Sequence, residues 1–242
     1  MLLAIDIGNT STTFGLFKGK RLVKQWRCGT DKAADGANKA AGVRWVIIAS
    51  VAPKMNAVIA KFIYKKFDIK PVFVTPKNCG IKIGYSKPHE VGADRLVDAV
   101  AAWHRYRKTC IVVDFGTATT LEYIDDKGVY WGGPIAPGIG IANKVLYEAA
   151  ARLPMTRLIP SSRMLPRSTK EAIQTGVYQG YIGLVEHLIR KMIQEVGGRP
   201  KVIATGGLAP LIKKGTGIFD DVDTLLTLKG LQIIWDRKKH LK

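Results

Sequence analysis

The sequence has few residues from which a disulfide framework or a metal cluster could be built. Its three cysteines, Cys28, Cys79 and Cys110, lie far apart without CxxC spacing, and its four histidines lack the spacing of metal ligands. These absences exclude a disulfide scaffold and a zinc-finger type of site, and they fit a reducing compartment. Cys110 stands in an apolar run and is expected in the core.

Long apolar segments and targeting signals are missing as well. The longest uncharged stretch, residues 128–143, is short and interrupted by glycines and prolines, so we expect no transmembrane helix. The apolar N-terminal run meets Asp6 at once, without a basic leader or a cleavage pattern, so we expect no signal peptide. Together with the free thiols, this predicts a cytoplasmic protein that needs no membrane.

Acidic residues are scarce. There are 19 Asp and Glu against 38 Lys and Arg, which gives a formal net charge of +19. Such an excess attracts polyanions, whether a nucleotide, a nucleic acid or an anionic surface. The basic residues are scattered, with local clusters at 18–27 and 237–242, and we find no aromatic-interleaved nucleic-acid motif beside them. We therefore expect a solvated basic surface for which nucleic acid is not required.

What the sequence does contain is one pattern twice. Residues 114–120, DFGTATT, resemble residues 6–13, DIGNTSTT, 108 positions earlier. Each stretch follows an apolar run and leads through hydroxyl residues into a second apolar run and a Lys-Gly turn, which predicts strand, tight turn and strand. Glycine allows close backbone approach to a ligand, and successive N–H and hydroxyl groups can hold an anion. The pair indicates a clamp for a nucleoside triphosphate and Mg²⁺; the alternative is two ordinary hairpins.

The rest of the chain alternates strands and helices, which indicates an α/β protein. With 47% hydrophobic residues in 242, the chain can bury one large core or two smaller lobes. A short Ala-rich helix just fits within residues 29–44 as a parallel crossover. Further strands are expected at 22–28, 45–50, 71–75 and 201–205, and further helices at 53–63, 96–103, 139–151, 168–196 and 227–238.

The segment 85–95, YSKPHEVGADR, precedes a helix with a clear apolar face. Asp94 therefore stands near a helix N-terminus, where an Asp commonly caps free N–H groups. The alternative is a general base that orients a bound hydroxyl and accepts its proton during attack on a γ-phosphate. Arg95 could pair with an acidic substrate or the transferred phosphoryl group, or form a surface ion pair.

The second half of the chain carries three further signals. Ser168 and Glu171 form a capping box for a long helix, with core positions expected at Ile173, Val177, Tyr181, Leu184, Leu188 and Met192. Gly176, Gly180 and Gly183 lie within this helix and suggest close approach of another lobe, a second subunit or a ligand, or packing within the chain. The stretch 204–207, ATGG, allows a nucleotide to lie against backbone.

Taken together, the stretches 6–10, 90–95, 114–120, 132–138 and 204–207 resemble the motifs of the type III pantothenate kinase family, in order and over nearly the whole chain. This resemblance implies the duplicated actin-like ATPase and sugar-kinase (ribonuclease H-like) fold of class α/β, with two lobes, 1–107 and 108–242, and the nucleotide cleft between them. It further implies a homodimer that phosphorylates pantothenate with ATP towards coenzyme A. Mg²⁺ with ATP and a monovalent cation, K⁺ or NH₄⁺, are the implied cofactors.

The resemblance also implies roles for individual residues. Asp94 would be the catalytic base, and Asp114 would bind the monovalent cation. The residues implied to contact ATP are Asp6, Ile7, Gly8, Asn9, Thr10, Ser11, Thr12, Thr13 and Thr117. The residues implied to bind pantothenate are Tyr85, Gly92, Ala93, Asp94, Arg95 and Thr169.

Two other functions remain open. One is a kinase of the same fold that acts on a different small hydroxyl substrate. The other is a non-catalytic nucleotide-binding protein whose basic surface binds nucleic acid or serves regulation. The presence of Asp94 beside both hairpins argues against the second.

Overall fold

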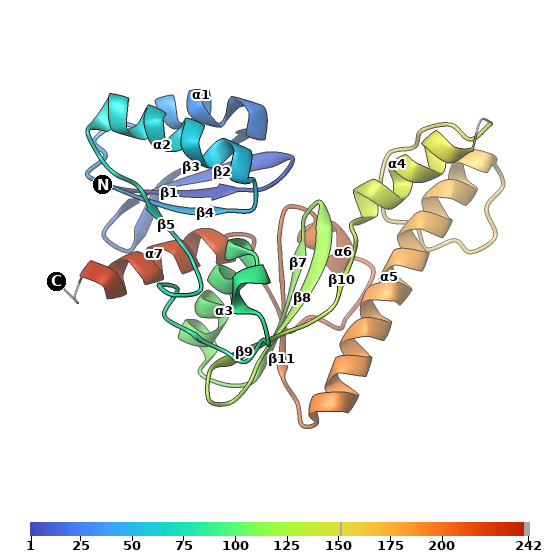
Figure 1. Ribbon diagram of the computed structural model, residues 1–242. Coiled ribbons are helices and arrows are strands. Elements are labelled where there is room, and N and C mark those ends of the chain that lie inside the picture. Colours follow the sequence, from blue (N-terminus) through green and yellow to red (C-terminus); the bar gives the residue numbers. More distant parts are fainter. Residues whose placement is uncertain (151, 240–242) are drawn as a thin grey trace. The chain divides into compact units, whose positions relative to one another are not determined.

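The computed structural model describes residues 1–150 and 152–239 (Figure 1). The chain forms two compact units. The first comprises residues 1–107, 128–131 and 225–242, and the second comprises 108–127 and 132–224. These units differ from the lobes predicted from the sequence, 1–107 and 108–242, because the strand at 128–131 and the closing helix pack with the first unit.

The first unit is built on a five-stranded sheet. Its order is β3 (Arg21–Gly29), β2 (Ser11–Lys18), β1 (Leu2–Ile7), β4 (Trp45–Ser50) and β5 (Val72–Phe73). β1 runs antiparallel to β2 and parallel to β4. The crossover from β3 to β4 contains a 3-10 turn (Thr30–Lys32) and helix α1 (Ala33–Asn38), which confirms the short helix expected within residues 29–44.

Helices cover both faces of this sheet. Leu3, Ile5 and Ile7 of β1 point to α1 and α2 (Pro53–Phe67), where they share a core with Ile59 and Ile63. The alternate residues of β1 point to the other face, which α3 (Ala93–Tyr106) and α7 (Leu226–Lys239) cover (Figure 1). A strand enclosed on both faces must be apolar throughout, and this explains the LLAI run of β1.

Helices α3 and α7 approach each other closely at Gly230. A Cβ placed on this residue would lie 2.2 Å from the carbonyl oxygen of Val97. Only glycine therefore permits this contact, which secures the closing helix to the first unit. Strands β6 (Lys82–Ile83) and β9 (Val129–Gly132) pair in parallel at one end of the second, seven-stranded sheet, and a 3-10 turn (Pro88–Glu90) follows β6 in the chain.

The second unit repeats the pattern of the first. Its strands are β12 (Asp221–Val222), β11 (Lys201–Thr205), β7 (Cys110–Phe115), β8 (Ala118–Ile124) and β10 (Ile135–Pro137). β7 runs antiparallel to β8 and parallel to β11, as β1 does to β2 and β4. The strands β1 and β7 also share one burial pattern, in which only the Asp is half-buried. Cys110 is fully buried, as predicted.

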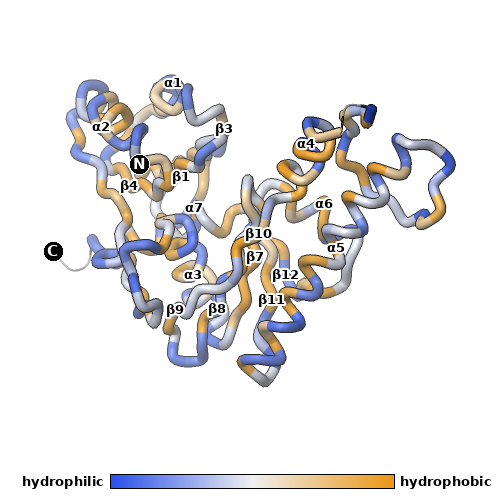
Figure 2. The backbone as a smooth tube through the Cα atoms, turned by 45° about the vertical axis from the view of Figure 1, so that its right-hand side comes forward, coloured by the Kyte–Doolittle hydropathy of each residue, from blue (hydrophilic) through white to orange (hydrophobic). Residues whose placement is uncertain are grey.

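Helix α5 (Thr169–Val196) covers the second sheet, with Tyr181, Val185 and Ile189 in its core, and α6 (Ala209–Lys213) follows β11. Figure 2 shows the apolar central strands of both units. Ser168 caps α5 by accepting a hydrogen bond from the Glu171 N–H (3.3 Å), as predicted. The Glu171 carboxylate, however, accepts from the N–H of Arg167 rather than from that of Ser168.

One of the core positions predicted for α5 is wrong. Leu184, predicted to lie in the core, is exposed on α5, and so are three apolar residues of α4 (Ile139–Ala149), Ile141, Val145 and Leu146. A Cβ on Gly176, Gly180 or Gly183 would meet nothing within 4 Å. The described part of the chain therefore offers no neighbour that explains these glycines. No helix among the described residues is long and apolar enough to cross a membrane.

Candidate active site

The first predicted hairpin is present, and its turn is tightly organised. Gly8 N–H donates to the Ser11 carbonyl (3.0 Å), and a Cβ on Gly8 would lie 3.0 Å from that oxygen. Asp6 is half-buried at the end of β1, while Asn9 and Thr10 are exposed in the turn. The turn thus presents backbone and short polar side chains beside a carboxylate, which suits an anion with a hydrated metal ion.

Two residues that the sequence did not single out hold this turn. The Thr30 hydroxyl donates to the Gly8 carbonyl (2.7 Å), and Thr30 N–H donates to the Thr10 carbonyl (3.2 Å). Arg27 donates from Nε to the Ser11 hydroxyl (2.9 Å). The only sequence signal for Thr30 was a hydroxyl residue following a strand, which is too common to identify a supporting role.

Not every residue of the hairpin offers its side chain to a ligand. Ile7 and Thr12 are fully buried, and the Thr12 hydroxyl forms a hydrogen bond with that of Thr30 (3.3 Å). Contacts of these two residues with a nucleotide would involve their backbone. The polar side chains of residues 6–13 that are exposed or half-buried are those of Asp6, Asn9, Thr10, Ser11 and Thr13.

The end of β4 connects this hairpin to the Asp94 segment within the first unit. Val51 N–H donates to the carbonyl of Ile7 (3.0 Å). A Cβ on Gly92 would lie 3.2 Å from Val51 Cγ1 and 2.5 Å from Asp94 Oδ1. Gly92 therefore permits the close packing that brings the start of α3 beside the end of β1.

Asp94 occupies the first turn of α3, and its environment suits a proton acceptor. Its Oδ1 accepts a hydrogen bond from the Arg95 N–H (2.8 Å), as a residue in the first turn of a helix can. Burial raises the pKa of the Asp94 carboxyl above its ordinary value, and the Arg95 N–H and guanidinium oppose this shift only in part. A carboxylate with a raised pKa is a better base than a fully solvated one.

The neighbours of Asp94 differ in exposure. Arg95 is only 8% exposed, so it is not the surface ion pair considered from the sequence. Ala93 is buried and Gly92 and Tyr85 are half-buried, with Tyr85 between β6 and the turn at Pro88–Glu90. Gly84, next to Tyr85, donates its N–H to the carbonyl of Tyr130 (2.8 Å) and so attaches this segment to β9.

The second hairpin lies in the second unit and contacts the ATGG segment there. Asp114 is half-buried at the end of β7, and the Gly116 N–H donates to the Ala118 carbonyl (3.1 Å) across the turn. Gly206, with φ +88°, follows β11, and a Cβ on it would lie 2.3 Å from Asp114 Oδ1. The exposed Thr117 stands in the turn and accepts a hydrogen bond from Gly138 N–H through its carbonyl (3.2 Å).

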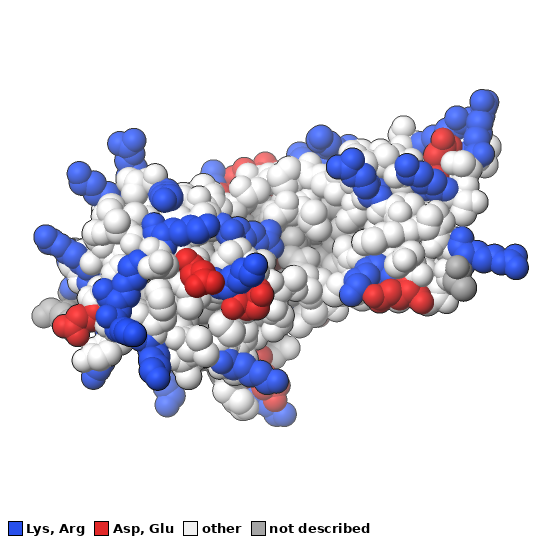
Figure 3. Space-filling view, turned by 90° about the horizontal axis from the view of Figure 1, so that it is seen from above, with Lys and Arg blue, Asp and Glu red and all other residues white. Residues whose placement is uncertain are grey.

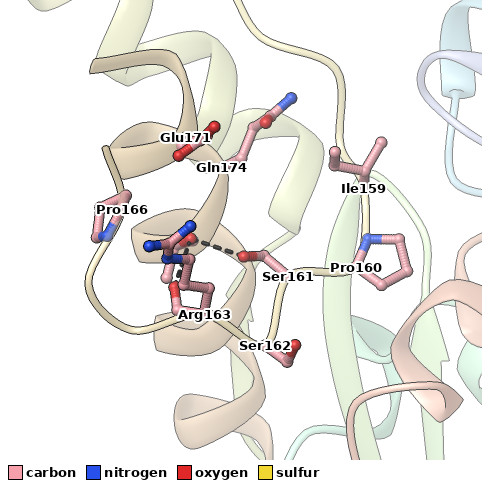
Figure 4. A pocket seen from close by; sticks show the side chains of 9 residues that line it. Ile159, Pro160, Ser161, Ser162, Arg163, Pro166, Glu171 and Gln174 are labelled. Carbon is pink, nitrogen blue, oxygen red and sulfur yellow. Dashed lines mark hydrogen bonds between the residues drawn. The ribbon is translucent and has the colours of Figure 1, made fainter. Parts of the chain in front are cut away.

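Thr169, the first residue of α5, is exposed in the second unit. A pocket of about 280 Å³ lies close to it, between the loop 159–166 and the first turns of α5 (Figure 4), but Thr169 does not line it. The hydroxyls of Ser161 and Thr175 in this pocket bond to each other (2.7 Å), and Thr175 also donates to the Arg163 carbonyl (3.2 Å). These bonds attach the loop to α5, so the two hydroxyls that line the pocket already have hydrogen-bond partners within the protein.

The described residues contain no group of three or more His, Cys, Asp or Glu that could hold a metal ion. Mg²⁺ commonly binds through one or two carboxylates together with substrate phosphates and water. Single half-buried carboxylates such as Asp6 and Asp114 fit a metal that arrives with a nucleotide. They do not fit a divalent metal held by the protein alone.

The fold class is defined by three features: the repeated hairpins, the glycine after β11 and the carboxylate at the start of α3. This is the duplicated actin-like ATPase and sugar-kinase fold. A putative Baf family transcriptional activator from Campylobacter jejuni superposes with a TM-score of 0.67 at 20% identity, covering 98% of this chain and 99% of that one. The activator of 2-hydroxyisocaproyl-CoA dehydratase from Clostridium difficile, with bound ADPNP, gives 0.55 at 12% identity, covering 100% and 98%.

Sequence comparison identifies the family. The sequence profile described as type III pantothenate kinase matches residues 2–191. The type III pantothenate kinase of Geobacter sulfurreducens is 42% identical over 255 residues, covering 99% of this chain and 100% of the relative. The chain belongs to the type III pantothenate kinase family, which confirms the resemblance inferred from its motifs, and it is a kinase.

Proposed function

We propose that this kinase transfers the γ-phosphoryl group of ATP to pantothenate, giving 4′-phosphopantothenate, the first step towards coenzyme A. The observation that carries this proposal is the position of Asp94, which the Val51–Gly92 contact brings beside the first hairpin. A base next to a phosphate-binding turn is the arrangement that phosphoryl transfer to a hydroxyl needs. The acceptor is inferred from the name of the relatives.

In the proposed mechanism, Asp94 orients the primary hydroxyl of pantothenate and accepts its proton as the oxygen attacks the γ-phosphorus in line. The raised pKa of Asp94 supports this role. Positioning and electrostatic stabilisation supply most of the rate, because the loose transition state requires little covalent help from the protein.

The ATP phosphates would contact the first hairpin, Asp6 to Thr13, mainly through the exposed turn and its backbone N–H groups, and Thr117 of the second hairpin. Mg²⁺, when bound with ATP, would neutralise the charge that develops on the phosphate oxygens. The carboxylate of Asp6 would hold water of this ion. Gly206 would permit close approach of the nucleoside.

Pantothenate would bind along Tyr85, Gly92, Ala93, Asp94 and Arg95, and to Thr169. The guanidinium of Arg95 is the natural partner for the substrate carboxylate or the transferred group, because a buried cation interacts strongly with an anion. Asp114 would bind a monovalent cation, K⁺ or NH₄⁺. The half-buried position of Asp114 at the end of β7 supports this site.

The proposal is tested by ATP consumption in Mg²⁺ buffer, with and without pantothenate, in K⁺ or Na⁺ alone. Turnover is expected to require pantothenate and to rise with K⁺. In Asp114→Asn the K⁺ stimulation is expected to vanish, because the neutral amide binds a cation far more weakly than a carboxylate. A panel of other small alcohols tests the acceptor, and turnover with one of them but not with pantothenate would reject pantothenate as substrate.

We further propose that the protein acts as a homodimer through an exposed apolar face of the second unit. This face comprises Ile141, Val145 and Leu146 of α4 and Leu184 of α5, with the open glycines 176, 180 and 183 beside Leu184 on α5. Four large apolar side chains exposed on two packed helices suit a protein interface, and the glycines would let a helix of a second copy approach.

Val145→Glu is expected to convert the dimer to a monomer, because it places a charge in the apolar face. Sedimentation equilibrium measures the change in mass. Val58→Glu on α2 is the matched control, since Val58 and Val145 are 50% and 53% exposed. A Val145→Glu protein with unchanged mass would exclude this face as the interface.

A further inference from the structure

The net charge of the protein is distributed unevenly between the two units. The first unit carries 24 Lys and Arg against 8 Asp and Glu, whereas the second carries 14 against 11. The first unit thus holds +16 of the total of +19. Figure 3 shows one face of the molecule, on which Lys and Arg predominate. Phosphorylation of a small anion does not require an excess of this size.

Within the first unit, where α3 and α7 pack against each other, three cationic side chains from three segments act on His104. His104 and Arg107 lie at the C-terminal end of α3, Arg237 in the last turn of α7, and Lys20 in the turn between β2 and β3. Arg237 donates from Nη1 to the carbonyl of Gly80 (3.0 Å), which fixes its position. We refer to Lys20, His104, Arg107 and Arg237 as the cationic cluster.

The charged members of the cationic cluster disfavour the protonated form of His104. Burial lowers the pKa of His104, and the charges of Arg237, Arg107 and Lys20 lower it further. Burial and Arg107 likewise lower the pKa of Arg237. Within residues 1–150 and 152–239, none of the four forms an ion pair with a carboxylate. The cluster is therefore an uncompensated positive site.

Favourable interactions with the negative ends of helices account for only part of this arrangement. Cations near the C-termini of α3 and α7 stabilise those helices, but Lys20 belongs to a hairpin turn. The end of α3 also reads Trp103-His104-Arg105-Tyr106-Arg107, a short alternation of aromatic and basic residues. Arg107 stacks over Trp103 (5.7 Å) and Arg105 over Tyr106 (5.1 Å), which holds the guanidinium groups in place.

We propose that the cationic cluster binds the phosphodiester backbone of a nucleic acid strand without sequence preference. Fixed guanidinium groups and a lysine suit successive phosphates. A membrane is the less suitable partner, because the exposed large apolar residues of the first unit, Val23, Val58, Tyr64 and Trp131, do not belong to the cluster. Without an apolar anchor beside them, cations bind a bilayer surface only weakly.

The test compares two full-length variants with the same loss of charge. The cluster variant carries Lys20→Gln, Arg107→Gln and Arg237→Gln. The control carries Lys54→Gln, Lys61→Gln and Lys65→Gln on α2, three exposed lysines on the other side of the first sheet. Fluorescence anisotropy with a labelled single-stranded DNA of mixed sequence, about 20 nucleotides long, measures affinity as a function of salt.

The cluster variant is expected to bind at least about tenfold more weakly than the wild type and to show a salt slope smaller by about 2, since each phosphate contact contributes about 0.7. The control is expected to stay within about threefold of the wild type. Because loss of the Arg237–Gly80 bond could destabilise the fold, Lys20→Gln/Arg107→Gln serves as a second cluster variant, compared with Lys54→Gln/Lys61→Gln.

Three results would overturn the proposal. Equal weakening in both variants would show that binding follows total charge and not this cluster. Preferential binding of the wild type to phosphatidylserine vesicles, lost in the cluster variant, would assign the cluster to membranes. A cluster variant that binds DNA normally but has a reduced kcat/KM for ATP would assign the cluster to attraction of substrate.

Discussion

Asp94→Asn is expected to reduce pantothenate-dependent ATP turnover by about 10³- to 10⁴-fold, at the upper end of what a general base contributes. The amide retains the size of the carboxylate and can still accept a hydrogen bond from the Arg95 N–H. It cannot accept a proton. Binding of ATP and pantothenate, measured by calorimetry, is therefore expected to stay within a few-fold of the wild type, so that the loss falls on kcat.

The raised pKa of Asp94 also predicts the effect of this substitution on stability. A folded-state pKa above the unfolded value favours the protonated form in the folded protein. The favourable contribution is complete below the unfolded pKa and is lost as the pH rises through the folded pKa. At neutral pH, above the unfolded pKa, the raised folded-state pKa of Asp94 therefore lowers stability, and Asp94→Asn is expected to unfold at the same or a higher temperature. The difference in unfolding temperature between Asp94→Asn and the wild type should shrink as the pH falls to about 4.

Asp68→Asn is the control for Asp94→Asn. Asp68 is exposed after α2 with φ 56°, a conformation that Asn tolerates well. Pantothenate-dependent turnover by the Asp68→Asn protein is expected to match that of the wild type. If Asp94→Asn kept near-normal kcat while remaining folded, Asp94 would not be the base, and another group would have to accept the proton.

Gly206→Ala is expected to lower the free energy of unfolding by about 2 to 5 kcal/mol, combining strain at positive φ with overcrowding. The new Cβ would lie 2.3 Å from Asp114 Oδ1 and 2.7 Å from the backbone of Phe115. The end of β7 must shift to relieve these contacts, and the carboxylate of Asp114 shifts with it. Stimulation by K⁺ is therefore expected to fall as well.

Urea unfolding and the cation dependence of turnover test this expectation. Gly217→Ala is the matched control, because a Cβ there meets nothing within 4 Å. It is expected to change stability by less than about 1 kcal/mol. A Gly206→Ala protein with wild-type stability and normal K⁺ stimulation would show that the contact between Gly206 and Asp114 does not matter for the site.

The elements of the fold were predictable from local patterns. The runs LLAI and IVV followed by Asp and Gly predict a buried strand, its end and a turn, and both hairpins formed there. Strand β4 was predicted with its observed bounds, residues 45–50, because a short apolar run between polar segments has few alternatives. The position of Asp94 at the start of α3 was predictable for the same reason.

Relations between distant segments were not predictable in this way. The side of α5 that faces its sheet was misjudged at Leu184, because the apolar residues of this helix lie on two faces and only packing decides between them. The closing helix α7 was assigned to the second lobe, whereas Gly230 packs it against α3 in the first unit. A single glycine in a helix does not indicate which neighbour approaches it.

The two hairpins, the carboxylates at their strand ends and the family could all be inferred from the amino-acid sequence, because these features depend on residues adjacent in the chain. Folding of the whole chain was needed to place Thr30 under the Gly8 turn, Val51 against Gly92, and Lys20 and Arg237 near His104. The members of the cationic cluster span more than half of the chain. Their convergence results from the packing of α3 and α7 on one sheet, which is the sum of many contacts that no local pattern encodes.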